Sequence, residues 1–255
     1  MRVETSNSPK LIFTDFNEVS DLPEGWAYPK IGEILTVNYG KGLKESVRVP
    51  MAIAVYGSNG VVGQHNIALT RGPTIIIGRK GTVGAVHFCD DACWPIDTTY
   101  FIDEFNGLDP KYLLYSLRSL GLTELDTSTA IPGLNRNELY DQHLPLSPLP
   151  EQKRIVAKLE ELLTRVNTTK ERLAKVSMIL LADAIEKRVA SATARADKLT
   201  QAILAKAFRG ELVPTEAELA RRDGRSYETA SELLARIKSE RQVKGKPKTK
   251  YRSKI

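Results

Sequence analysis

The chain has 255 residues, of which 42% are hydrophobic and 27% charged, and its formal net charge is +6. This composition supports a folded core and excludes a chain that is disordered throughout. No stretch approaches the ~18 uncharged apolar residues of a membrane span, and the N-terminal residues lack the apolar core of a signal peptide. Two cysteines, Cys89 and Cys93, give no disulfide framework, so we expect a cytoplasmic protein.

The positive charge is unevenly distributed. Residues 235–255 carry nine Lys or Arg and one acid, whereas residues 1–150 carry twelve basic and seventeen acidic side chains. Between Glu45 and Asp90 there is no acidic residue, although Arg48, Arg71, Arg79 and Lys80 all fall there. A local basic face of this kind can meet phosphates even within an acidic domain.

The first part of the chain predicts a mixed α/β domain over residues 21–150, after a polar leader over residues 1–20. Strand-like runs alternate with glycine-rich turns. They cover Met51–Tyr56, Thr74–Ile77, Thr82–Phe88 and Thr98–Ile102. Helical spacing follows at Pro110–Leu120, and a second short helix is expected at Asn135–Tyr140. The fold class predicted for the whole chain is therefore α+β.

The turn in IIIGRKGTVG (75–84) places Arg79 and Lys80 between glycines. Three interpretations compete: a cradle for a nucleotide phosphate, a loop that reaches DNA, or an ordinary hairpin tip kept soluble by its charges. A P-loop is disfavoured, because its lysine follows the glycine and enters a helix. Here Lys80 precedes Gly81, and a β-branched run follows.

Residues 151–209 contain no glycine or proline and predict one long helix. A continuous helix of this length would extend roughly 88 Å. Its apolar positions follow steps of four and three, with a phase slip near residues 181–184. Such a seam calls for a partner helix, and the alternative is a helix lying along the chain's own first domain. The predicted interface residues are Ile155, Leu159, Leu162, Val166, Leu173, Val176, Leu180, Ile185, Val189, Leu199 and Ile203.

Two short amphipathic helices are expected over residues 210–243, where they would dock other parts of an assembly. Thr229 and Glu232 have the spacing of a capping box. Residues 244–255 are basic and are expected to be a disordered tail.

The sequence offers no convincing catalytic or metal-binding set. Glu151-Gln152-Lys153 imitates half of a nuclease metal site, but a carboxylate in the first turn of a helix is favoured by the helix dipole alone. His87, Cys89 and Cys93 supply three ligands and no fourth, so small buried side chains are the better interpretation. The expected role is binding and positioning.

Several long segments, in order, resemble the specificity (S) subunit of type I restriction–modification systems. The resemblance spans nearly all of residues 22–241. The segments are LPEGW (22–26), YGSNGVVG (56–63), IIIGRKGTVG (75–84), WPIDTTYFI (94–102), AIPGLNRNEL (130–139), LPEQKRIVAKLEELL (149–163) and AFRGELVPTEAELARRDGRSYE (207–228).

The resemblance implies a non-catalytic subunit with a target recognition domain that grips double-stranded DNA and a helical spacer. The spacer would dock modification (M) subunits, which bind S-adenosylmethionine and methylate adenine at N6. A restriction (R) subunit, where present, would bring ATP and Mg. No cofactor is expected in this chain. Its single recognition domain resembles half of a usual S subunit, so a second copy is the expected partner for the helix, and an interrupted palindrome the expected target.

On this interpretation the turn residues face DNA. Arginine can grip guanine or clamp a phosphate, and serine and asparagine in turns can donate to either. The expected DNA-binding residues are Ser58, Asn59, Arg71, Arg79, Lys80, Asn135 and Arg136. Each of them has an alternative role in turn geometry alone. Two rival functions remain: a coiled-coil adaptor whose N-terminal domain binds protein, and a stand-alone enzyme.

Overall fold

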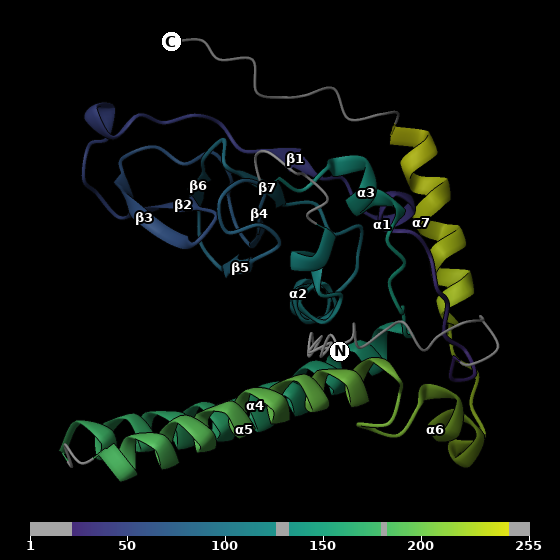
Figure 1. The fold of residues 1–255 in the computed structure, drawn as a ribbon. Helices are drawn as coiled ribbons and strands as arrows, with labels where there is room; N and C mark the ends of the chain where they lie inside the picture. The colour runs from purple at the N-terminus through teal and green to yellow at the C-terminus, as the bar shows by residue number, and fades with distance from the viewer. Residues whose placement is uncertain (1–21, 126–132, 180–182, 245–255) are drawn as a thin grey trace, which may run out of the picture.

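The computed structural model describes residues 22–125, 133–179 and 183–244 (Figure 1). The expected leader over 1–20 and nearly all of the expected tail over 244–255 lie outside the described residues. The first part contains α1 (Ile31–Ile34), β1 (Asn38–Tyr39), a 3₁₀ turn η2 (Glu45–Val47), β2 (Ile53–Gly57), β3 (Gly60–His65), β4 (Thr74–Gly78), β5 (Val86–Cys89), β6 (Cys93–Pro95) and β7 (Thr99–Ile102). The remainder contains α2 (Pro110–Ser119), η3 (Leu122–Leu125), α3 (Arg136–Asp141), α4 (Leu149–Ile179), α5 (Asp183–Phe208), α6 (Glu216–Asp223) and α7 (Ala230–Lys244). The α+β prediction is confirmed.

The strands form two separate sheets. One has the order β1-β7-β4-β5 and is antiparallel throughout, and the other has the order β3-β2-β6, in which β2 and β6 are parallel. Strand β4 is buried along its whole length, as its run of three isoleucines indicates. The four predicted strand runs correspond to β2, β4, β5 and β7, while the six-residue strand β3 and the short strands β1 and β6 were not predicted.

Helix α2 lies between the sheets and the long helices (Figure 1). Its start is fixed by Asp109, whose side chain accepts hydrogen bonds from the backbone N–H groups of Lys111 and Tyr112. This N-cap satisfies donors that the first turn leaves unpaired. Leu113 and Leu117 are fully buried, so the predicted apolar face of this helix is part of the core.

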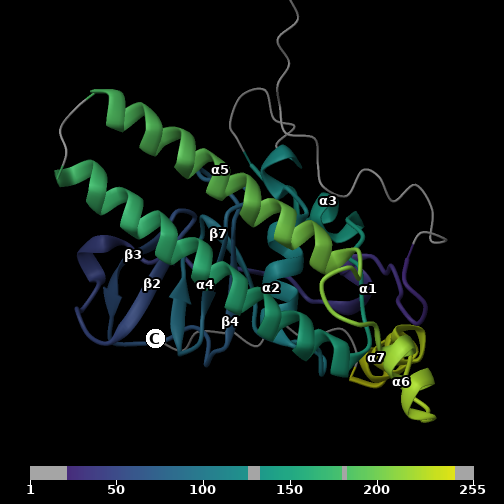
Figure 2. The ribbon, with the colours of Figure 1, turned by 90° about the horizontal axis from the view of Figure 1, so that it is seen from below.

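The predicted single helix over 151–209 is wrong, because the structure divides it into α4 and α5. The two run antiparallel, side by side, as a helical hairpin (Figures 1 and 2). Lys170 of α4 forms an ion pair with Asp197 of α5. The division falls at the predicted phase slip. Folding the rod back on itself gives the apolar seam a partner within the chain, so the expected lack of an intramolecular partner is also corrected.

The predicted interface residues differ in how deeply the hairpin buries them. Ile155, Leu159, Val166 and Ile203 are buried, and Leu162, Leu173 and Val189 are partly buried. Leu199 is 51% exposed, so it lies outside the seam between α4 and α5. On α5 the buried or half-buried positions include Ala196, Thr200, Ile203 and Ala207, whose spacing places Leu199 one residue off the seam. Leu180 and the side chains of Val176 and Ile185 lie outside the described residues.

The C-terminal helices close onto the beginning of the domain. Leu233 and Ile237 of α7 are fully buried in the same core as Ile31 and Ile34 of α1, and α7 lies beside α1 in Figure 1. Lys238 forms an ion pair with Glu33 at 2.6 Å. The predicted helices over 210–243 are therefore present as α6 and α7, and α7 is part of the core of the first domain.

Candidate nucleic-acid interface

Four segments meet at the end of the domain where β2 and β4 finish. They are the β2–β3 turn, the β4–β5 turn, the turn before β7 that contains Thr98, and residues 133–136. A Cβ atom added to Gly81 would lie 3.3 Å from Oγ of Ser58, and one added to Gly78 would lie 3.2 Å from Cβ of Ser58. The β2–β3 turn is thus packed against the β4–β5 turn. The ring Nε2 of His87, on β5, lies 3.0 Å from the carbonyl oxygen of Ser58 and also holds the β2–β3 turn in place.

The glycines of the β4–β5 turn are required by close packing. A Cβ atom on Gly78 would lie 2.0 Å from the carbonyl oxygen of Thr82, and one on Gly84 would lie 2.4 Å from the backbone of Leu122 and Thr123. Gly84 also has a φ of +73°, which side chains rarely tolerate. The glycines therefore shape the framework, and the two basic residues between them remain to be explained.

The backbone around Arg79 is fixed from two sides. The N–H groups of Arg79 and Lys80 donate to the carbonyl of Thr98 at 2.9 and 3.1 Å, and the N–H of Leu134 donates to the carbonyl of Arg79 at 2.9 Å. The hydroxyl of Tyr100 donates to the carbonyl of Leu134 at 3.0 Å. These bonds bring residues 133–136, distant in sequence, beside the turn.

The result is a hollow with a volume of about 310 Å³. It is lined by Tyr39, Arg79, Lys80, Tyr100, Gly133, Leu134, Asn135 and Arg136. Four of the seven predicted DNA-binding residues therefore share one site. Within the described part of the chain, Arg79, Lys80 and Arg136 form no ion pair with a carboxylate, so their charge is available to a ligand.

Aromatic rings hold both arginines. The guanidinium of Arg79 lies 5.5 Å from the ring centroid of Tyr39 and 5.8 Å from that of Tyr100. The guanidinium of Arg136 lies 4.8 Å from the ring centroid of Tyr39. These distances are within the range of cation–π attraction. Burial, together with the neighbouring Tyr39, raises the pKa of Tyr100 to about 12, so this phenol stays neutral.

The other predicted residues occupy different positions. Ser58 is half-buried in the β2–β3 turn and Asn59 is exposed beside it, so both border the loop cluster. Asn135 lines the hollow, but its side-chain oxygen caps α3 by accepting from the N–H of Asn137 at 2.8 Å. Arg71 precedes β4, and Arg79 follows it. The five-residue strand separates them by roughly 13 Å or more, so the structure does not bring Arg71 to the site.

Sequence reasoning missed Tyr39 and Tyr100. Tyr39 is 51% exposed, and its ring meets that of Tyr100 edge-on at 5.0 Å. The pairing of β1 with β7 places Tyr39 opposite Tyr100. The only local signal was a tyrosine followed by the Gly-Lys-Gly of residues 40–42, which does not disclose that pairing.

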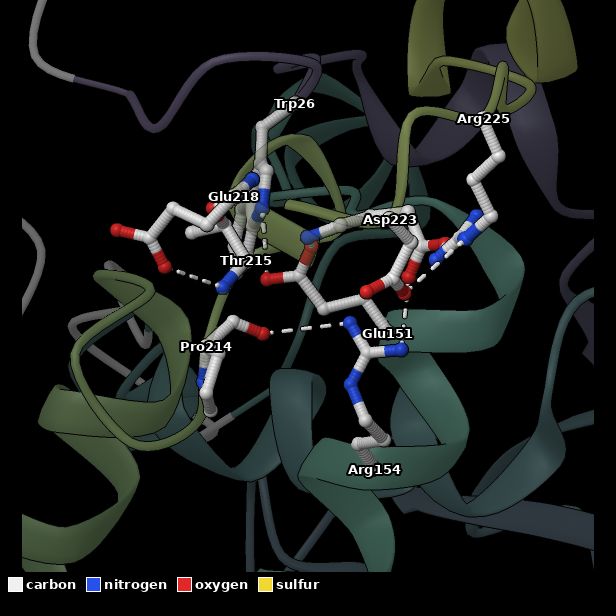
Figure 3. Close-up of polar contacts among 9 residues, drawn as sticks. Trp26, Glu151, Arg154, Pro214, Thr215, Glu218, Asp223 and Arg225 are labelled. Carbon is white, nitrogen blue, oxygen red and sulfur yellow. Dashed lines mark hydrogen bonds and ion pairs between the residues drawn. The ribbon is translucent and has the colours of Figure 1, made fainter. Parts of the chain in front are cut away.

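A second polar cluster joins three of the segments that carry the family resemblance (Figure 3). Glu151 is fully buried at the start of α4. One carboxylate oxygen accepts from the indole N–H of Trp26 at 3.1 Å, and the other accepts from the backbone N–H of Glu216 at 2.8 Å. Burial raises the pKa of Glu151 to about 7.

Glu216 is also buried in this cluster, and it is paired with Arg154 at 2.7 Å and Arg225 at 2.6 Å. Burial alone would raise its pKa, but hydrogen bonds from the two arginines lower it overall. The cluster clamps residues near 26, 151 and 216 together. Glu151 therefore has a structural role, and the half-motif of a nuclease site is explained without catalysis.

The described residues contain no group of three or more His, Cys, Asp or Glu side chains placed to hold a metal ion. Cys93 is buried with its sulfur 3.2 Å from the hydroxyl oxygen of Thr70, and burial raises its pKa to about 11. Among the described helices, none combines the length and the apolar character needed to cross a bilayer.

Comparison with known proteins places this architecture in a family. Residues 23–178 match the family described as the type I restriction modification DNA specificity domain. The match covers more than half of the chain, and the chain belongs to this family, whose members are non-catalytic components of type I restriction–modification enzymes.

Two relatives from Escherichia coli show the extent of the similarity. The EcoDI type I restriction enzyme specificity subunit is 39% identical over 121 residues, which cover 47% of this chain and 23% of the relative. The EcoBI specificity subunit is 37% identical over 175 residues, which cover 67% of this chain and 33% of the relative. The chain thus matches a quarter to a third of the length of these relatives.

A solved structure of the type I R-M system, reported for its complex assembly and conformational transition, contains a chain of similar fold. The alignment covers 77% of this chain and 49% of the other, with a TM-score of 0.51 and 24% sequence identity. At this identity the likeness shows the fold alone.

Proposed function

We propose that the chain is the DNA sequence-recognition subunit of a type I restriction–modification complex. The observation that carries the proposal is the hollow at the loop cluster, where Arg79, Lys80 and Arg136 gather without a carboxylate partner among the described residues. Cations gathered at loop tips suit the phosphate backbone of a duplex. The exposed Asn59 beside them supplies a side chain that can reach a base edge.

In this proposal the chain selects the site and its partners perform the chemistry. M subunits bind S-adenosylmethionine and methylate adenine at N6, and an R subunit, where one exists, binds ATP and Mg and cleaves. The chain itself needs no cofactor. A subunit that binds chromosomal DNA in a bacterium works in the cytoplasm, and we propose this location for the chain.

We further propose that a second copy of the chain supplies the second reading domain of a bipartite target. The structural relative above is matched over 49% of its length, so one copy accounts for about half of such a subunit. Since the α4 seam is paired with α5 within the chain, the two copies would associate through another surface or by exchanging α5.

Binding measurements on the chain with its M subunits test the reading role. We expect Arg79→Ala and Lys80→Ala each to weaken binding to the methylated target duplex by roughly 5- to 100-fold, about 1–3 kcal/mol per lost contact. Circular dichroism should show the fold unchanged. A fluorescence anisotropy titration at several salt concentrations measures both the affinity and its salt dependence.

Arg71→Ala is the matched control, because Arg71 is an exposed arginine at the opposite end of β4. Its affinity for the duplex should change by less than about twofold. Equal losses of affinity in Arg71→Ala and Arg79→Ala would show that DNA binding depends on the overall charge of the domain and not on the hollow. A complex that ignores DNA and binds a protein through this face would instead support an adaptor.

A further inference from the structure

The ring of Tyr39 is shared by two arginines from different parts of the chain. Arg79 follows β4 and Arg136 begins α3, yet their guanidinium groups lie 5.5 and 4.8 Å from the same ring centroid. Arg136 also lies 5.9 Å from the ring of Tyr140. Two cations placed this close to one ring repel each other, and an anion between or beside them would relieve that repulsion.

Both arginines that line the hollow have donor groups without a hydrogen-bond partner among the described residues. Arg79 uses Nε and Nη2, which donate to the carbonyl of Asp97 at 3.3 and 2.6 Å. This fixes one edge of the guanidinium and leaves Nη1 without a hydrogen-bond partner in the part of the chain that the structure describes. The Nε atom of Arg136 is buried and has no hydrogen-bond partner within the described residues. A buried donor without a partner is unfavourable, so a ligand that brings an acceptor to Arg136 would bind more tightly.

The polar groups of the hollow suit an anion better than a base edge. Three of its side chains, those of Arg79, Lys80 and Arg136, are cationic, and the one amide oxygen, in Asn135, is engaged in capping α3. A cluster of cationic donors matches the several acceptor oxygens of a phosphate, whereas among the bases only guanine presents two neighbouring acceptors in the major groove. The two arginines are also half-buried, whereas Asn59 and Lys80 are exposed at the turn tips.

We propose that the hollow between Tyr39, Arg79 and Arg136 binds a phosphodiester group of the DNA backbone and sets the register of the domain, while sequence is read elsewhere. This proposal rests on the proposed function of DNA recognition. Tyr39 is a positioning residue, since its ring holds both guanidinium groups in place. The turn tips that carry Asn59 and Lys80 would then lie over the neighbouring base pairs.

The test measures affinity and sequence preference separately. The full chain with its M subunits is titrated with a duplex that carries the host's methylated target and with a scrambled duplex of equal length. We expect Arg136→Gln and Arg79→Gln each to weaken binding to both duplexes by a similar factor, about 5- to 100-fold. The slope of log K against log salt should fall by about one per arginine.

A single uncharged methylphosphonate, moved along the target strands, locates the phosphate. At one position it should weaken the wild-type complex and have no further effect on the Arg136→Gln variant. A ratio of target to scrambled affinity that collapses in Arg136→Gln, with the salt slope unchanged, would identify a base reader and overturn the clamp. Equal sensitivity of variant and wild type at every methylphosphonate position would also overturn it.

Two variants of Tyr39 test the positioning role. Tyr39→Phe keeps the ring and should bind both duplexes within about twofold of the wild type, whereas Tyr39→Leu should bind both about two- to tenfold more weakly. Equal losses in both variants would contradict a role for the ring. If the wild-type complex itself fails to distinguish the two duplexes, the proposed function is wrong; if it distinguishes them and the arginine variants do not behave as above, only the clamp is wrong.

Discussion

At the scale of single residues, the buried carboxyl of Glu151 links stability to pH. Its pKa is raised to about 7 by burial, against ~4.3 in an unfolded chain. The folded state therefore holds this proton more tightly, and the contribution to the free energy of unfolding is full below about pH 4. It declines as the pH rises toward 7, by a total on the order of 3 kcal/mol.

Thermal unfolding between pH 5 and pH 8 measures this effect. The Glu151→Gln variant has no ionisable group at this position. Its melting temperature should therefore fall less between pH 5 and pH 8 than that of the wild type. At pH 5 the variant should be less stable, because both oxygens of the protonated carboxyl can accept from the N–H groups of Trp26 and Glu216, whereas the NH₂ group of the amide cannot accept. Glu161→Gln, an exposed carboxylate of the same helix, is the control and should keep the wild-type slope. Identical slopes in all three proteins would contradict the assignment.

These residues also mark what could be predicted from the sequence. The basic turn at Arg79 and Lys80 was found because its charges stand between glycines in a segment without acids. Asn135 and Arg136 were named but could not be joined to that turn, since the joining bond runs from Leu134 to Arg79 across 55 positions of the chain. The contact between Trp26 and Glu151 spans 125 positions, and no local pattern discloses it.

At the scale of elements, the hairpin of α4 and α5 follows a seam that differs from the one predicted. Periodicity identified the apolar face of α4, because Ile155, Leu159 and Val166 keep one phase. On α5 the seam contains alanines and threonines, and the large Leu199 lies outside it. A pattern of spacing also contains no information on whether the partner is another chain or the same one, which is why the hairpin was not predicted.

Two alanine substitutions on α5 distinguish the observed seam from the predicted one. Ile203 is buried against the core, so Ile203→Ala should lower the free energy of unfolding by about 2–4 kcal/mol. Leu199 is exposed, so Leu199→Ala should change it by no more than about 0.5 kcal/mol. Denaturant titration measures both. A loss of similar size in the two variants would indicate that α5 pairs in the predicted phase.

At the scale of the whole molecule, the beginning and the end of the described chain are built into one body. Residues of α1, α2, α4 and α7 belong to a single core cluster, and α2 separates the sheets from the hairpin (Figure 1). The loop cluster is therefore held on a frame that includes the helices. In the proposed pairing with a second copy, a rigid attachment of this kind would fix the distance between the two loop clusters.

Two identical copies related by a two-fold axis must read the same sequence on opposite strands. The methylated sites of the host genome should therefore form an interrupted palindrome, which sequencing that detects N6-methyladenine can reveal. Lys80→Ala should then lower methylation at both half-sites by the same factor, because one gene product reads both. A control duplex with one half-site scrambled should lose methylation whichever half is altered. Two unrelated half-sites, of which Lys80→Ala affects only one, would show that a different chain supplies the second reading domain.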